Sequence, residues 1–223
     1  MELLIALALM TAFAYFGRKV LKKHPWMFYS AALVLDAGYL YYRFFCDFHP
    51  IAQVLMIYMQ RGLLAFALFV VVMYIGVLSD SSKLYKALMP VRSELSIVAC
   101  ILILGHMIGY LIGYLASLQV GVSAMRPNIL LALIIAVLLT VLVGVLGITS
   151  FKRIRIRMQP KVWKRIQRWA YVFFALVFVH LGLFLIPAAL SGSKVWLQAL
   201  VYLVLFAAYV ILRIRKDRKK DRV

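Results

Sequence analysis

Two histidines lie inside runs of apolar residues and are the first candidates for chemistry in this chain. His106 stands in "ILILGHMIGYL" and His180 in "FALVFVHLGLFL". An imidazole in such surroundings costs free energy unless a ligand or a hydrogen bond compensates it. The other two histidines, His24 and His49, fall at the ends of apolar runs, where we expect water to solvate them.

The two buried histidines are expected at matching depths in a membrane. Each follows a polar helix start, near Arg92 and Arg168 respectively, by a similar number of residues. At about 1.5 Å of rise per residue, both imidazoles lie roughly 17–20 Å from that boundary. Two imidazoles at one level, on helices that run the same way, can ligate one haem iron from opposite faces. The alternative is that each donates a hydrogen bond between helices and has no ligand role.

Composition sets the class of protein that must position these histidines. Of 223 residues, 66% are hydrophobic and 15% are charged, whereas soluble domains contain roughly 45–50% apolar residues. Continuous apolar runs of about 20 residues predict an all-α, polytopic transmembrane helix bundle of about seven spans. The expected spans are residues 2–17, 28–45, 51–78, 95–117, 128–148, 169–187 and 195–213.

The net charge of +19 follows the membrane topology and does not indicate nucleic acid. With alternating spans, 22 of the 26 Lys and Arg residues fall on one side, in the segments 18–23, 83–92, 152–168 and 213–222. The positive-inside rule then predicts an outer N-terminus and an inner C-terminus. Contact with anionic membrane lipid explains these runs, and the alternative is a docking surface for a partner or a flavin phosphate.

Small residues lie on the same helix as His106. Gly109 and Gly113 are one turn apart in "GHMIGYLIGY" and share nearly one face. Small side chains there let either a flat macrocycle or a neighbouring helix come close. Both interpretations remain open from the sequence.

The order and spacing of several segments resemble the ferric-reductase-like transmembrane domain family, closest to MsrQ-type haem b membrane subunits. The segments are "RSELSIVACILILGHMIGYL" and, one span later, "LGITSFKRIRIRMQPKVWKRIQRWAYVFFALVFVH". The resemblance covers about residues 50–213. It implies a six-span haem-binding core with an extra N-terminal helix, and His106 and His180 as the axial ligands of a b-type haem.

The resemblance also implies which parts of the family's site are present. Relatives with two haems carry a second histidine about 13–14 residues before each of these, but Arg92 and Gln167 stand there in this chain. We therefore expect one haem b per chain. Arg61, about 16 Å into its span by helical rise, corresponds to an arginine near the outer haem of relatives and would meet a haem propionate or an acceptor. The alternative is an ion pair with Asp36.

These observations predict three domains and leave three functions open. The domains are N-terminal transmembrane helices (1–49), the haem-binding transmembrane domain (50–213) and a basic cytoplasmic tail (214–223). The first function is electron transfer in a bacterial cell membrane, from a quinol or a bound flavin (FMN) to an extracytoplasmic reductase or flavinylated protein. The second is a small ferric or metal reductase acting directly at its outer face. The third is a non-redox scaffold or transporter. In the first case the chain is a component of an oxidoreductase system.

Overall fold

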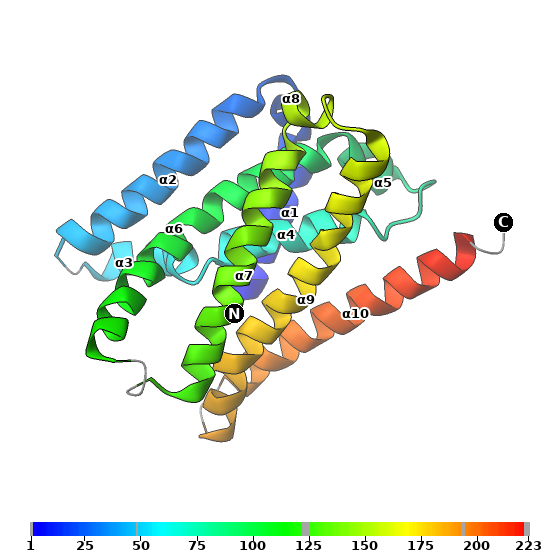
Figure 1. Cartoon of the computed structure of the whole chain (residues 1–223). Helices are drawn as coiled ribbons and strands as arrows, with labels where there is room; N and C mark the ends of the chain where they lie inside the picture. The colour runs from blue at the N-terminus through cyan, green and yellow to red at the C-terminus, as the bar shows by residue number, and fades with distance from the viewer. Residues whose placement is uncertain (1, 48, 122–124, 193–194, 221–223) are drawn as a thin grey trace. The chain divides into compact units, whose positions relative to one another are not determined.

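The computed structural model describes residues 2–47, 49–121, 125–192 and 195–220, and all regular structure in these ranges is helical (Figure 1). The elements are α1 (Glu2–Lys23), α2 (Pro25–Phe45), α3 (Pro50–Gln60), α4 (Leu63–Ile75), α5 (Lys83–Leu88), η1 (Met89–Val91), α6 (Arg92–Val120), α7 (Pro127–Ser150), α8 (Lys152–Arg155), α9 (Pro160–Leu190) and α10 (Trp196–Lys220). The described ranges contain no strand, so the all-α prediction is confirmed.

Several of these helices are long and apolar enough to cross a membrane. In the described part of the chain there are five, or six if the bent pair α3–α4 forms one span. The chain is therefore a multi-pass membrane protein, but the expected number of seven spans is not confirmed. The difference is α2, which forms a helix in the expected place but carries four tyrosines, Asp36 and Arg43, so it is less apolar than the other spans.

Proline residues mark the beginning of four helices. Pro25, Pro50, Pro127 and Pro160 are the first residues of α2, α3, α7 and α9. Proline suits this position because its fixed φ matches a helix and its missing N–H has no helical acceptor to lose. Each of these prolines directly follows a polar or basic residue between apolar runs and marks where the next helix begins.

The chain packs as two compact units, Met1–Leu111 and Ile112–Val223, each of which is described by itself. In the first unit α4 packs against α1, and almost every residue of α4 is buried. A helix that is apolar on all sides must lie inside other elements. The expected domain limits at 49, 50 and 213 concern the family domain rather than packing, and they stay a prediction.

The third expected span is broken. Helix α3 ends at Gln60 and α4 begins at Leu63, with an angle of 47° between the pair. Gly62 between them has a φ of 62°, in the left-handed region that glycine adopts without the penalty of a Cβ. At this break the last backbone carbonyls of α3 have no donor within the helix, as they would have in a continuous helix.

In the second unit α9 packs against both α7 and α10. Phe174 of α9 is 2% exposed, stacks on Phe206 with ring centroids 4.4 Å apart, and contacts Tyr209 edge-on at 5.0 Å. Aromatic pairs of this kind add to the stabilisation that burial alone provides. This cluster contributes buried aromatic contacts to the interface between α9 and α10.

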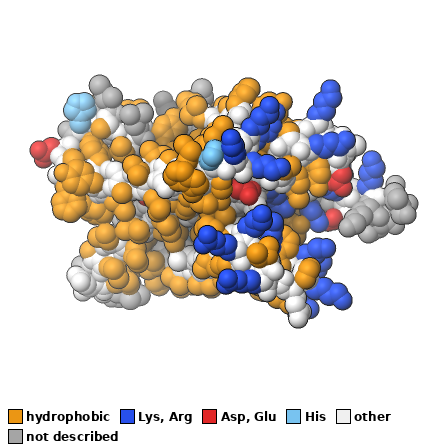
Figure 2. All heavy atoms as spheres, turned by 90° about the horizontal axis from the view of Figure 1, so that it is seen from above, with side chains coloured by type: hydrophobic (Ala, Val, Ile, Leu, Met, Phe, Trp, Pro, Cys, Tyr) orange, Lys and Arg blue, Asp and Glu red, His pale blue; other side chains and the backbone are white. Residues whose placement is uncertain are grey.

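The described surface is largely apolar, as a lipid-facing protein requires. Figure 2 shows broad areas of hydrophobic side chains and separate groups of Lys and Arg on one face. Large apolar side chains such as Val34 and Val137 are 70% and 58% exposed. Exposed apolar area on this scale marks contact with a membrane or a partner.

The Phe174 cluster gives a first prediction. We expect Phe174→Ala to lower the free energy of unfolding by about 3 kcal/mol, because it leaves a cavity between α9 and α10. Val172→Ala, on an exposed side chain of the same helix, is the matched control and should change it by less than about 0.5 kcal/mol. Unfolding of the purified protein in detergent measures both, and equal losses for the two variants would contradict the proposed packing.

Candidate functional site

His106 lies on α6 and is held by a backbone carbonyl of the first unit. Its Nδ1 atom is 2.7 Å from the carbonyl oxygen of Gln60. A carbonyl can only accept a hydrogen bond, so Nδ1 carries the proton and the lone pair of the ring is on Nε2. Ligating histidines typically have this arrangement, because the second hydrogen bond fixes both the tautomer and the ring orientation.

The break between α3 and α4 supplies that carbonyl. Gln60 is the last residue of α3, and the final carbonyls of a helix have no acceptor role within it. A Cβ on Gly62 would lie 2.8 Å from Ile103 Cδ1 and 3.4 Å from His106 Cγ. Glycine at this position therefore satisfies two demands, a left-handed backbone and a close approach to α6.

His180 on α9 has a closely similar environment in the second unit. Its Nδ1 atom is 3.2 Å from the carbonyl oxygen of Ala132 on α7, which again places the proton on Nδ1. An aromatic ring follows each histidine by one turn: Tyr110 with ring centroids 4.8 Å from His106, and Phe184 at 5.3 Å from His180. Both imidazoles are thus positioned by a carbonyl and an aromatic neighbour.

The donor set of the described residues fits a haem better than a bare metal ion. No group of three or more His, Cys, Asp and Glu side chains converges among them, as a structural metal site would need. A haem brings four nitrogen ligands of its own and takes only axial ligands from the protein. His106 belongs to the first unit and His180 to the second, so their sharing of one iron stays a prediction.

Two of the three glycines of α6, Gly105 and Gly109, serve helix packing in the first unit. A Cβ on Gly109 would lie 3.1 Å from Tyr39 Oη, so Gly109 lets α2 come close to α6. The tightest contact is at Gly105, which the sequence interpretation missed: a Cβ there would lie 2.6 Å from Asp36 Oδ1. Gly113 has nothing within 4 Å of the same position. Glycines recur every four residues at 105, 109 and 113, and this spacing could have indicated a close contact at Gly105 as well.

Arg61 lies at the break and forms an ion pair with Glu2. Its Nη1 atom is 2.6 Å from Glu2 Oε2, and the two side chains are 46% and 39% exposed. The alternative expectation, an ion pair with Asp36, is wrong. The carboxylate oxygens of Asp36 have no hydrogen-bond partner among the described residues, although this side chain is only 5% exposed. A role of Arg61 beside a haem stays a prediction.

Gln167 on α9 stands where relatives with two haems carry a second histidine, and here it has a structural role. Gln167 Nε2 donates to Thr149 Oγ1 at 3.0 Å, and Trp163 Nε1 donates to the Thr149 carbonyl, also at 3.0 Å. Both bonds join α9 to the end of α7. Gln167 is therefore engaged in holding two helices together.

The carbonyl–histidine contact gives a second prediction. We expect Gly62→Ala to lower the free energy of unfolding by about 1–2 kcal/mol, because alanine disfavours the left-handed backbone. The Gln60 carbonyl should then shift, so the ring-nitrogen NMR shifts of His106 should change even in haem-free protein. Gly144→Ala on α7, where a Cβ has open space, is the control. Unchanged His106 shifts in Gly62→Ala would contradict this role of the break.

The α2–α6 contact gives a third prediction. Gly105→Ala should lower the free energy of unfolding by about 1–3 kcal/mol, because its new methyl group meets the buried Asp36 carboxylate. Gly113→Ala should leave it within about 0.5 kcal/mol or raise it, because the added Cβ meets nothing and alanine favours a helix. Thermal unfolding of the two variants side by side is the measurement, and a larger loss for Gly113→Ala would count against the packing.

Two comparisons with known proteins found matches to this chain. The family model described as "ferric reductase like transmembrane component" matches residues 61–179, which include His106 and end one residue before His180. A protein of Treponema pallidum (strain Nichols), described as uncharacterized, is 39% identical over 157 residues. That alignment covers 70% of this chain and 43% of the relative, so the chain spans less than half of the relative's length. No solved structure matches. The family match covers more than half of the chain, and the chain therefore belongs to the ferric reductase-like transmembrane family.

Proposed function

We propose that this chain is a haem b electron-transfer subunit of a bacterial cell membrane. It passes electrons from a membrane donor, a quinol or a bound flavin, to an extracytoplasmic reductase or a flavinylated protein. The observation that carries the proposal is the matched environment of His106 and His180 within a ferric reductase-like chain. Each imidazole donates from Nδ1 to a backbone carbonyl, which directs its lone pair to Nε2.

The chain's own residues would bind, orient and shield the cofactor. His106 and His180 would be the axial ligands, and the apolar runs around them would exclude water. A haem with two histidine ligands supplies a one-electron carrier without an open coordination position, which suits electron transfer better than substrate binding at the metal. The family membership supports a membrane electron-transfer or reductase role, and the MsrQ type is the finer assignment that we favour.

One haem per chain follows from the residues at the alternative ligand positions. Gln167 already donates its amide to Thr149, and an amide is a weak ligand beside imidazole. Arg92 stays protonated and has no lone pair for iron. A quinol or a bound flavin is the donor that we favour for a single haem, because either can reach it within the membrane. With an outer N-terminus and an inner C-terminus, both histidines are expected roughly 17–20 Å from the inner boundary, so the haem lies in the outer half and the acceptor side is extracytoplasmic.

A direct ferric or metal reductase is the second candidate. The description of the family favours it, because that description names a ferric reductase. The two candidates share the haem and differ in the acceptor. Reduction of a soluble ferric chelate by the purified chain and a chemical reductant would favour this second candidate. Absence of haem from protein made in haem-replete cells would instead favour a scaffold or transporter, in which the histidines only join helices.

The ligand assignment gives a fourth prediction. We expect a reduced-minus-oxidised absorption spectrum of a low-spin b-type haem, with about one haem per chain. His106→Ala and His180→Ala should each abolish this spectrum, because the iron loses one of two protein ligands.

His24→Ala and His49→Ala are matched controls and should keep wild-type haem content, because neither side chain lies in an apolar run. A wild-type spectrum in His106→Ala or His180→Ala, with folding verified by thermal unfolding, would remove the ligand assignment. Two haems per chain would remove the single-haem proposal.

A further inference from the structure

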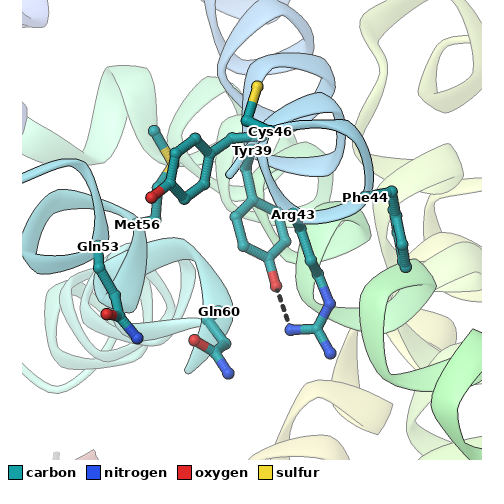
Figure 3. Close-up of a pocket in the computed structure, with 8 residues that line it drawn as sticks. Tyr39, Arg43, Phe44, Cys46, Gln53, Met56 and Gln60 are labelled. Carbon is teal, nitrogen blue, oxygen red and sulfur yellow. Dashed lines mark hydrogen bonds between the residues drawn. The ribbon is translucent and has the colours of Figure 1, made fainter. Parts of the chain in front are cut away.

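A pocket of ≈ 520 Å³ lies in the first unit, between the end of α2 and α3 (Figure 3). This volume is within the range of about 300–1,000 Å³ that is usual for small-molecule sites. Its lining includes Tyr39, Arg43 and Phe44 from α2, and Gln53, Met56 and Gln60 from α3. All of these residues precede the part of the chain that the family model matches, residues 61–179.

Hydrogen-bond donors dominate the polar part of this pocket. Arg43 Nη1 donates to Tyr39 Oη at 3.0 Å, which orients the guanidinium and leaves its other N–H groups for a ligand. In the described ranges no carboxylate forms an ion pair with Arg43. The side-chain amides of Gln53 and Gln60 add further donors, and Figure 3 shows the Gln60 amide between the Gln53 amide and the guanidinium. This set suits a ligand with acceptor oxygens.

The rest of the lining is apolar and held in place. Phe44, Met56 and the ring of Tyr39 offer flat or adaptable apolar surface. Tyr42, another lining residue, joins the end of α2 to the residue before α3: its hydroxyl accepts from the His49 N–H at 3.0 Å and donates to the His49 carbonyl at 3.2 Å.

The pocket adjoins His106 through two residues. Gln60 lines the pocket and gives its carbonyl to His106 Nδ1. The guanidinium of Arg43 lies over the Tyr110 ring, 5.6 Å from its centroid, and Tyr110 contacts the His106 ring. Gln60 and Tyr110 would then lie between a ligand in this pocket and His106.

We propose that this pocket binds a planar ring with conjugated carbonyl oxygens, the chemistry shared by a quinone headgroup and the isoalloxazine of a flavin. The carbonyl oxygens accept from Arg43, Gln53 and Gln60, and the ring packs against Phe44 and Met56. The proposal is carried by the hydrogen-bond donors and the aromatic and apolar side chains that line the pocket. The inference that the ligand would exchange electrons with a haem on His106 rests on the proposed function.

The test is binding of two probes, a short-chain benzoquinone and riboflavin, to the purified full chain in detergent, by equilibrium dialysis. We expect one-to-one binding of at least one probe. Arg43→Leu and Gln60→Leu should each weaken it about tenfold or more, because each removes donors from the ligand oxygens. Gln60→Leu removes the side-chain amide and keeps the backbone carbonyl that holds His106.

Matched variants separate loss of the site from loss of folding. Tyr41→Phe, on an exposed side chain of α2 outside the pocket, and Arg126→Leu should bind as the wild type does. If Arg43→Leu fails to fold, Gln60→Leu and Gln53→Leu provide the answer. Tighter binding of the quinone identifies the site as a quinone site, and tighter binding of riboflavin identifies a flavin site.

Two outcomes would overturn the inference. They are binding of neither probe by folded wild-type protein, and wild-type affinity in folded Arg43→Leu and Gln60→Leu. Binding is measured on both haem-free and haem-loaded protein. A chain that never takes up haem but binds a probe in this pocket would overturn the proposed function and leave this inference intact.

Discussion

The hydrogen bond between His106 Nδ1 and the Gln60 carbonyl pairs two polar groups that would each cost free energy if left unpaired in a membrane. A broken helix in a membrane leaves backbone carbonyls without partners, and each such group costs several kcal/mol in lipid. A histidine in an apolar run has the same difficulty with its ring nitrogens. Here each satisfies the other at 2.7 Å. Gly62 favours this contact because its φ of 62° suits glycine and because a Cβ there would lie 2.8 Å from Ile103 Cδ1.

Close packing of α2 on α6 determines what surrounds this contact. Gly105 and Gly109 let the helices approach until Asp36 and Tyr39 fill the space that a Cβ would occupy. That approach places Arg43, one turn beyond Tyr39, over the Tyr110 ring. The glycines of α6 therefore affect the surroundings of His106 indirectly, by allowing α2 to pack close to α6. This packing brings the polar end of α2, where the pocket lies, to the residues next to His106.

Most helix positions could be predicted from the sequence, because apolar runs act locally. The break at Arg61 and Gly62 could not, because a hydropathy window averages over one glycine, and the φ of that glycine depends on contacts with α6. The pairing of Arg61 with Glu2 joins residues 59 positions apart, so no local pattern indicates it. Glycine spacing predicted a close approach to α6 at Gly109, but the tightest contact is one turn earlier, at Gly105, where the shape of Asp36 decides.

The two units differ in how their polar groups are used. In the first unit, α2 and α3 gather donors around a cavity beside His106. In the second, Gln167 and Trp163 use their donors on Thr149 and so join α9 to α7. A side chain that holds helices together cannot also ligate iron, so the second unit offers His180 without a second ligand on α9. If the chain holds one haem, as we propose, that haem must receive electrons from one molecule and pass them to another. The donor-rich pocket next to His106 provides a place for one of these two molecules.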